Sequence, residues 1–275
     1  MLSNKLYQND NIKINKCKNR LNLIYYANNK DIYAIFGDKF VKNNISNIKL
    51  IINGENIILV KKYKLNKGEN NIEIIINNKL TSLEDMFYNI YILKDIEELK
   101  YLDTEYINNL SYMFYGCTSL SDIKPLENWD VSNVNNFSYM FDGCTSLSDI
   151  KSLEKWNVSK VNNFSDMFNG CTSLNDIKSL KNWNVANGNN FSDMFNGCIS
   201  LSDISPLSDW NVSQGKNFSL MFYGCKSLSD IKPLEKWNVS KGNNFSGIFF
   251  GCTSLSDLKP LENWNVEKDK LEFIK

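Results

Sequence analysis

Six cysteines spaced 27 residues apart constrain the fold of this 275-residue chain more than any other feature. Tryptophan, phenylalanine and leucine keep the same spacing, in phase with the cysteines. A fixed period of this size indicates a repeat architecture, in which each unit buries its apolar side chains against its neighbours. The columns are Cys117, Cys144, Cys171, Cys198, Cys225 and Cys252; Trp129, Trp156, Trp183, Trp210, Trp237 and Trp264; Phe114, Phe141, Phe168, Phe195, Phe222 and Phe249; and Leu120 through Leu255.

A degraded seventh copy opens the array. Met86-Phe87 aligns with Met113-Phe114, whereas Ile90 and Leu102 stand where the later copies have cysteine and tryptophan. Apolar character without identity is expected of a terminal unit. We therefore predict a β-rich N-terminal cap over residues 1–80 and about seven repeats over residues 81–275, the first degenerate and the last truncated. Leu271, Phe273 and Ile274 are expected to close the array.

Apolar residues recur about every three positions within one unit, which fits neither a long amphipathic helix nor an alternating strand. We predict a short strand at 120–123, an extended stretch at 129–131 and a short helix at 136–141 that ends at Gly143. The expected fold class is an α/β repeat, a leucine-rich-repeat-like right-handed solenoid of short strands and short helices.

The first 80 residues carry clusters of β-branched and aromatic residues that predict strands. The expected strands are 23–26, 32–36, 48–52, 56–60 and 72–76. Asn53-Gly54 is a strong hairpin signal, and 66–71 predicts a looser turn. This region is either a cap on the first coil or a separate targeting or dimerising module.

A repeated phrase gives the array its family resemblance. Residues 140–147 (MFDGCTSL), followed by Trp-Asn-Val-Ser at 156–159 and Asn-Phe-Ser at 163–165, resemble the BspA-type leucine-rich-repeat surface proteins. The resemblance covers about residues 81–266 and implies a leucine-rich-repeat-like solenoid. For bacterial surface members it also implies adhesion to host or matrix proteins. No apolar signal segment opens the chain as given, so we expect a cytoplasmic protein, with a cell-surface or secreted location as the alternative.

The composition argues against several classes of function. The absence of histidine removes the commonest general base and metal ligand. No phosphate-binding glycine motif occurs, so we expect neither an enzyme nor a bound cofactor. Lysine plus arginine equal aspartate plus glutamate at 31 each, which disfavours nucleic acid. No apolar run is long enough to span a membrane.

Three further columns have competing interpretations. The cysteines are expected to be buried, reduced packing thiols, with disulfides between coils or a metal site as alternatives, and Cys17 has no evident partner. An aspartate column is expected to fix a repeated turn, with calcium binding as the alternative. Val134 and Val161 give way to glycine in later units, which predicts altered coil geometry or a shallow groove. The aspartates are Asp95, Asp122, Asp149, Asp176, Asp203, Asp230 and Asp257, and the glycines are Gly188, Gly215 and Gly242.

The positions directly before Met-Phe and directly after Phe vary between units, while the core columns stay fixed. Tyrosines gather at both ends of these positions and acids lie between them, a pattern that suits a binding patch, although neutral drift would also produce it. The candidate partner-binding residues are Tyr112, Tyr115, Tyr139, Asp142, Asp166, Asp193, Tyr223 and Phe250. The sequence thus favours a protein-binding scaffold, adhesin-like or otherwise. The alternatives are a structural, self-assembling protein and a calcium-dependent binding module.

Overall fold

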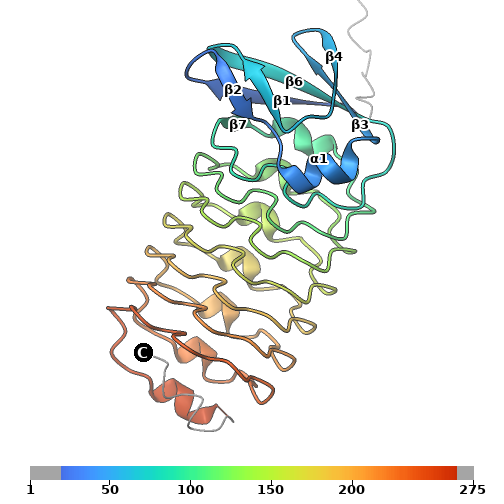
Figure 1. Cartoon of the computed structure of the whole chain (residues 1–275). Coiled ribbons are helices and arrows are strands. Elements are labelled where there is room, and N and C mark those ends of the chain that lie inside the picture. The colour runs from blue at the N-terminus through green and yellow to red at the C-terminus, as the bar shows by residue number, and fades with distance from the viewer. Residues whose placement is uncertain (1–19, 265–275) are drawn as a thin grey trace, which may run out of the picture.

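The computed structural model of the chain describes residues 20–264. An N-terminal sheet region with one short helix lies at one end of a long stack of similar coils (Figure 1). The N-terminal elements are β1 (Arg20–Ala27), β2 (Asp31–Ala34), α1 (Asp38–Asn44), β3 (Ile48–Ile52), β4 (Glu55–Ile58), β5 (Lys62–Leu65), β6 (Gly68–Ile76) and β7 (Leu93–Asp95). The 3-10 helices of the array are η1 (Glu97–Tyr101), η2 (Lys124–Leu126), η3 (Lys151–Leu153), η4 (Lys178–Leu180), η5 (Ser205–Leu207), η6 (Lys232–Leu234) and η7 (Lys259–Asn263).

All five strands predicted in the N-terminal region are confirmed. They lie in a five-stranded sheet of order β4-β3-β6-β1-β7, with antiparallel neighbours, and in a small sheet that pairs β2 with β5. The hairpin at Asn53-Gly54 is also confirmed, because β3 and β4 pair across it and both residues have left-handed φ angles of 54° and 83°. The pattern missed β5 and α1, both of which carry several polar and charged residues.

Strand β7 links the sheet to the array. It belongs to the first, degenerate copy, yet its residues pair with β1, with Tyr25 opposite Leu93. The sheet therefore continues directly into the first coil, and the apolar core runs through both regions (Figure 1). The division of the chain at residue 80 stays a prediction.

Backbone hydrogen bonds join each 27-residue unit to the next. Phe137 N donates to Asn163 O at 3.0 Å, Tyr139 N to Ser165 O at 2.9 Å and Phe141 N to Met167 O at 3.0 Å. The same ladder recurs in the following units, with parallel bridges between the repeated asparagines. The chain is a repeat protein, mostly β with few helices, whose 3-10 turns return at regular spacing.

Two local predictions for the repeat unit are wrong. Residues 136–141 form turns rather than a helix, and 120–123 contain no strand. In a helix the amide groups of 137, 139 and 141 would bond within the segment, but here they donate to the next unit. Asn136 still shapes the chain locally, because its Oδ1 accepts a bond from Ser138 N at 3.0 Å. The helical element of each unit is a 3-10 helix farther along, such as η2.

The repeated columns form the core of the stack. The tryptophans are buried, and each donates its indole N–H to a leucine carbonyl of the preceding unit, as Trp183 does to Leu153 O at 3.0 Å. The six described cysteines are buried and free, as predicted, and Cys171 Sγ donates to Phe141 O at 3.2 Å. Phe141 stacks on Phe168 at 5.8 Å between ring centroids.

The glycines that replace valine do not open a groove. A Cβ added to Gly215 would lie 2.2 Å from Cζ of Phe218, and Gly188 and Gly242 face the equivalent rings in the same way. The phenylalanine three residues later therefore fills the space that a larger side chain would occupy.

Some predictions fall outside the described residues. These concern Cys17 and the closing residues Leu271, Phe273 and Ile274. Within residues 20–264, no helix has both the length and the apolar character needed to cross a bilayer.

Candidate interaction surface

Two variable columns form one stripe along the side of the stack, which we call the aromatic–acidic stripe. The first column precedes Met-Phe, or Ile-Phe in the last unit, and comprises Asp85, Tyr112, Tyr139, Asp166, Asp193, Leu220 and Gly247. The second follows the phenylalanine and comprises Tyr88, Tyr115, Asp142, Asn169, Asn196, Tyr223 and Phe250. Every residue of the first column has a positive φ angle, from 57° to 65°. This conformation is uncommon outside glycine, so the turn is enforced by its surroundings.

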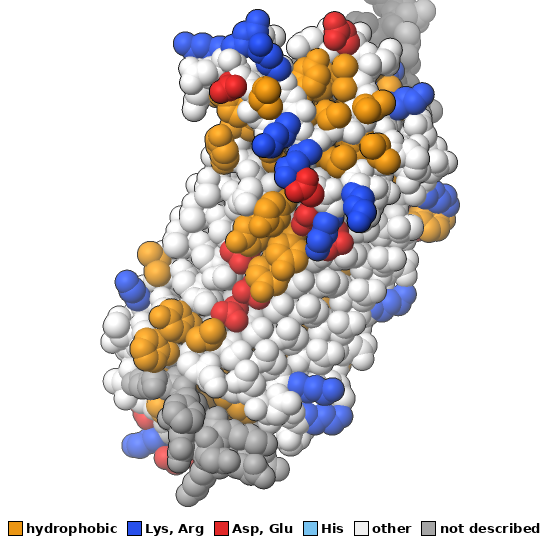
Figure 2. Space-filling model, in the orientation of Figure 1, with side chains coloured by type: hydrophobic (Ala, Val, Ile, Leu, Met, Phe, Trp, Pro, Cys, Tyr) orange, Lys and Arg blue, Asp and Glu red, His pale blue; other side chains and the backbone are white. Residues whose placement is uncertain are grey.

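Four tyrosines stack at the N-terminal end of the stripe. Tyr88 stacks on Tyr115 with 4.7 Å between ring centroids, and Tyr112 stacks on Tyr139 at 4.4 Å. The two pairs contact each other, since Tyr112 and Tyr115 lie 5.9 Å apart. All four rings are half-buried. Figure 2 shows the resulting band of hydrophobic-class side chains, bordered by charged ones.

Three aspartates continue the stripe below the tyrosines. Burial raises the pKa of Asp142 to about 6, and burial together with the charge of Asp193 raises that of Asp166 to about 7. Burial also raises the pKa of Asp193. Amides supply the neighbouring hydrogen bonds, from Asn169 Nδ2 to Asp142 Oδ2 at 3.1 Å and from Asn196 Nδ2 to Asp193 Oδ1 at 2.8 Å.

No basic side chain compensates these carboxylates. Among residues 20–264, the ion pairs involve other acids, and no lysine or arginine reaches Asp142, Asp166 or Asp193. Asp166 is only 7% exposed. Buried charges in proteins are normally paired, so an uncompensated group of this kind is unusual.

The stripe ends in a separate aromatic pair. Tyr223 and Phe250 stack at 5.4 Å, and they are 38% and 52% exposed. The structure therefore brings six of the eight candidate residues into one continuous cluster. It places Tyr223 and Phe250 farther along the same columns.

The sequence analysis missed four residues at the N-terminal end of the stripe. Asp85 and Tyr88 occupy the two columns in the degenerate first copy, so extending the 27-residue register back to Met86-Phe87 would have found them. Lys39 and Glu84 complete the group. Lys39 comes from α1, outside the repeats, and no signal within the array points to it.

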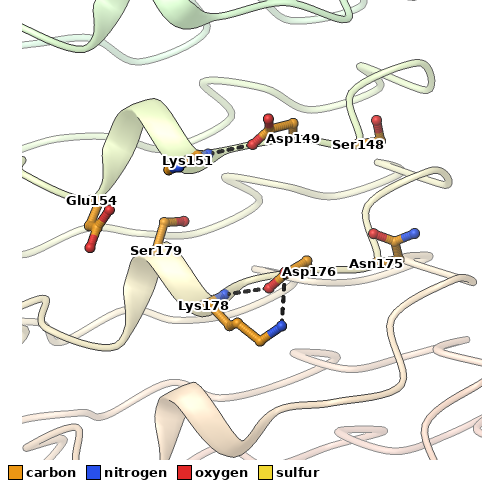
Figure 3. A pocket seen from close by; sticks show the side chains of 8 residues that line it. All are labelled: Ser148, Asp149, Lys151, Glu154, Asn175, Asp176, Lys178 and Ser179. Atoms are coloured by element: carbon orange, nitrogen blue, oxygen red, sulfur yellow. Dashed lines mark hydrogen bonds and ion pairs between the residues drawn. The ribbon is translucent and has the colours of Figure 1, made fainter.

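The aspartate column on a different face fixes turns, as predicted. Asp149 Oδ1 accepts a bond from Lys151 N, and Asp176 Oδ1 accepts one from Lys178 N, at 2.8 and 2.9 Å. Figure 3 shows these pairs around a hollow between adjacent units, which Glu154 and Ser179 also line. Within residues 20–264, no group of three acidic or thiol side chains is arranged to hold a metal ion.

Comparison with known proteins identifies the array. A family model described as Mycoplasma protein of unknown function, DUF285, matches residues 81–204 and again residues 148–264. Searches of curated proteins and of solved structures found no match. The two matches overlap and together span residues 81–264, more than half of the chain. The chain therefore belongs to this Mycoplasma repeat family, DUF285.

Proposed function

We propose that the chain is a non-catalytic scaffold that binds a protein partner through the aromatic–acidic stripe. The observation that carries the proposal is the group of half-buried tyrosines beside three uncompensated carboxylates. These side chains lie on columns that vary between units, whereas the packing columns are constant. Tyrosine-rich patches with few competing charges are typical of binding surfaces.

The architecture that fits this role is a leucine-rich-repeat-like right-handed solenoid. The ladder between units and the buried leucine columns support it. A solenoid offers a long side face on which successive units align equivalent side chains. The BspA-like resemblance makes adhesion at a cell surface the more specific form of the proposal.

A non-catalytic role agrees with the chemistry of the chain. Histidine is absent from the sequence, and the acidic residues of the stripe recur in register from unit to unit. Catalysis requires differently placed acid, base and nucleophile around one reacting centre. Equivalent side chains along an extended face suit recognition of an extended partner better, and this role needs no cofactor.

The test uses site-specific photo-cross-linking in cells that produce the chain. A photoreactive residue at Tyr115 is expected to capture a partner, and one at Tyr91, exposed but off the stripe, is not. Substituting Tyr112, Tyr139 and Tyr223 with serine should abolish the capture while leaving the circular dichroism spectrum unchanged. Equal capture at both positions, or capture that survives the substitutions, would contradict the proposal.

Self-association is the second candidate function. Strand β4 is an edge of the five-stranded sheet, and Ile58 on it is 69% exposed. Unprotected edge strands pair readily with other chains. Light scattering across a concentration series should show dimers or larger species that Ile58→Lys removes. A chain that stays monomeric at all concentrations would eliminate this role.

A further inference from the structure

Lys39 shows which kind of group the stripe accepts. Its Nζ lies 2.6 Å from Glu84 Oε1 and 5.5 Å from the centroid of the Tyr112 ring. Its backbone N–H donates to Asp85 Oδ2 at 3.4 Å. Asp85 and Tyr112 are consecutive members of the first column of the stripe. The chain thus places one of its own lysines over a stripe tyrosine and beside a stripe aspartate.

The same pairing recurs two units later without a cation. Tyr139 precedes Asp166 in the column as Asp85 precedes Tyr112, so a ring and a carboxylate again lie in adjacent units. Asp166 faces Tyr139, Ser165, Asp142 and Asp193, and none of these carries positive charge. In Figure 2, basic side chains lie beside the upper end of the orange band, whereas acidic side chains at its lower end have none next to them.

We propose that Asp142, Asp166 and Asp193 receive lysine or arginine side chains from an exposed basic segment of the protein partner. This inference rests on the proposed function and specifies the chemistry of the partner. Carboxylates form charge-assisted hydrogen bonds with these cations, and the Tyr115 and Tyr139 rings offer cation–π contact.

Partner cations also explain why the chain retains these buried carboxylates. The raised pKa values of Asp142 and Asp166 show that their ionised forms are poorly solvated in the free protein. A docked cation would stabilise the ionised forms and lower both pKa values. Groups that are poorly satisfied in the free protein are common at binding sites.

The spacing of the units sets the form of the partner segment. Neighbouring strands lie about 4.8 Å apart, so the three aspartates, spread over three consecutive units, span about 10 Å. Side chains on one face of an extended segment recur about every 7 Å. Basic residues at alternate positions of an extended segment therefore match the length of the acidic part.

The test measures binding of a defined basic peptide to the full chain. The probe is a fluorescein-labelled ten-residue peptide of alternating arginine and glycine, and citrulline replaces arginine in its neutral control. Fluorescence anisotropy is measured near pH 8 and at about 50 mM salt, where charge screening is modest. The stripe variant carries Asp142→Asn, Asp166→Asn and Asp193→Asn. The matched control carries Asp149→Asn, Asp176→Asn and Asp203→Asn, which removes the same charge from another face.

We expect the arginine peptide to bind the wild-type chain and the control variant alike. The stripe variant should bind at least about tenfold more weakly, and the citrulline peptide should not bind. Binding should also weaken below about pH 6, where Asp142 and Asp166 take up protons. Equal affinity for both variants, or no binding to the wild-type chain near pH 8, would overturn the inference. If cross-linking at Tyr115 still captured a partner in that case, the scaffold function would stand with a different partner chemistry.

Discussion

Substituting Asp166 with asparagine should stabilise the protein at neutral and alkaline pH. The carboxyl is 7% exposed, and its pKa is about 7 rather than the ordinary 3.8. Below about pH 4 the group is protonated in the folded and unfolded states alike, so it contributes no difference. Between pH 4 and 7 only the unfolded state ionises, and above pH 7 the folded state carries the full cost of the buried charge. Asparagine never ionises, and it tolerates the left-handed φ of 57° at this position.

The size of the effect follows from the pKa. A rise of about 3 corresponds to at most about 4 kcal/mol at 1.36 kcal/mol per pKa unit. Water at the surface screens part of this penalty, so we expect a gain of about 2 kcal/mol near pH 8. Near pH 4 the gain should vanish.

Urea unfolding followed by circular dichroism at both pH values measures the difference between variant and wild type. Asp176→Asn is the matched control, because the Lys178 backbone N–H and ammonium hold the pKa of Asp176 below its usual value. Its ionised form is favoured by folding, so its loss should destabilise the protein near pH 8. This effect should diminish toward acid pH. An Asp166→Asn variant no more stable than wild type near pH 8, or equally stabilised at both pH values, would refute the reasoning.

Three further predictions concern the core. Gly215→Ala should destabilise the chain by about 1–3 kcal/mol, because the added Cβ meets the Phe218 ring at 2.2 Å; unfolding in urea measures this, and an unchanged midpoint would contradict it. Trp183→Phe should cost about 1–3 kcal/mol, because a buried carbonyl loses its indole donor; a neutral result in the same assay would show that it finds another partner. In a Cys17→Ser background, the remaining six thiols should resist Ellman's reagent near pH 8 until the protein unfolds, because they are buried and burial raises the pKa of thiols such as Cys171. Fast reaction of the native protein would disprove the packing of the cysteine column.

The features that the sequence predicted correctly depend on residue identity at fixed spacing. The buried tryptophan and cysteine columns follow from the 27-residue period, and the hairpin follows from the preference of Asn53-Gly54 for positive φ. The helix at 136–141 was wrong because its amide groups have partners 26 residues away, and no local pattern reveals such partners. Lys39 was missed for a similar reason, since α1 meets the stripe only after the sheet region packs against the first coil.

The backbone of the stripe explains how its side chains can differ so widely. Tyr112, Asp166 and Leu220 have φ angles of 58°, 57° and 57°, and each amide donates to a serine carbonyl of the next unit at 2.9 Å. The neighbouring units therefore fix the turn, whatever side chain it carries. Substitution in this column changes the chemistry of the surface without altering the ladder. The core columns permit no such change, because each indole and thiol has a defined carbonyl partner. An array built in this way can alter what it binds while keeping the packing that holds it together.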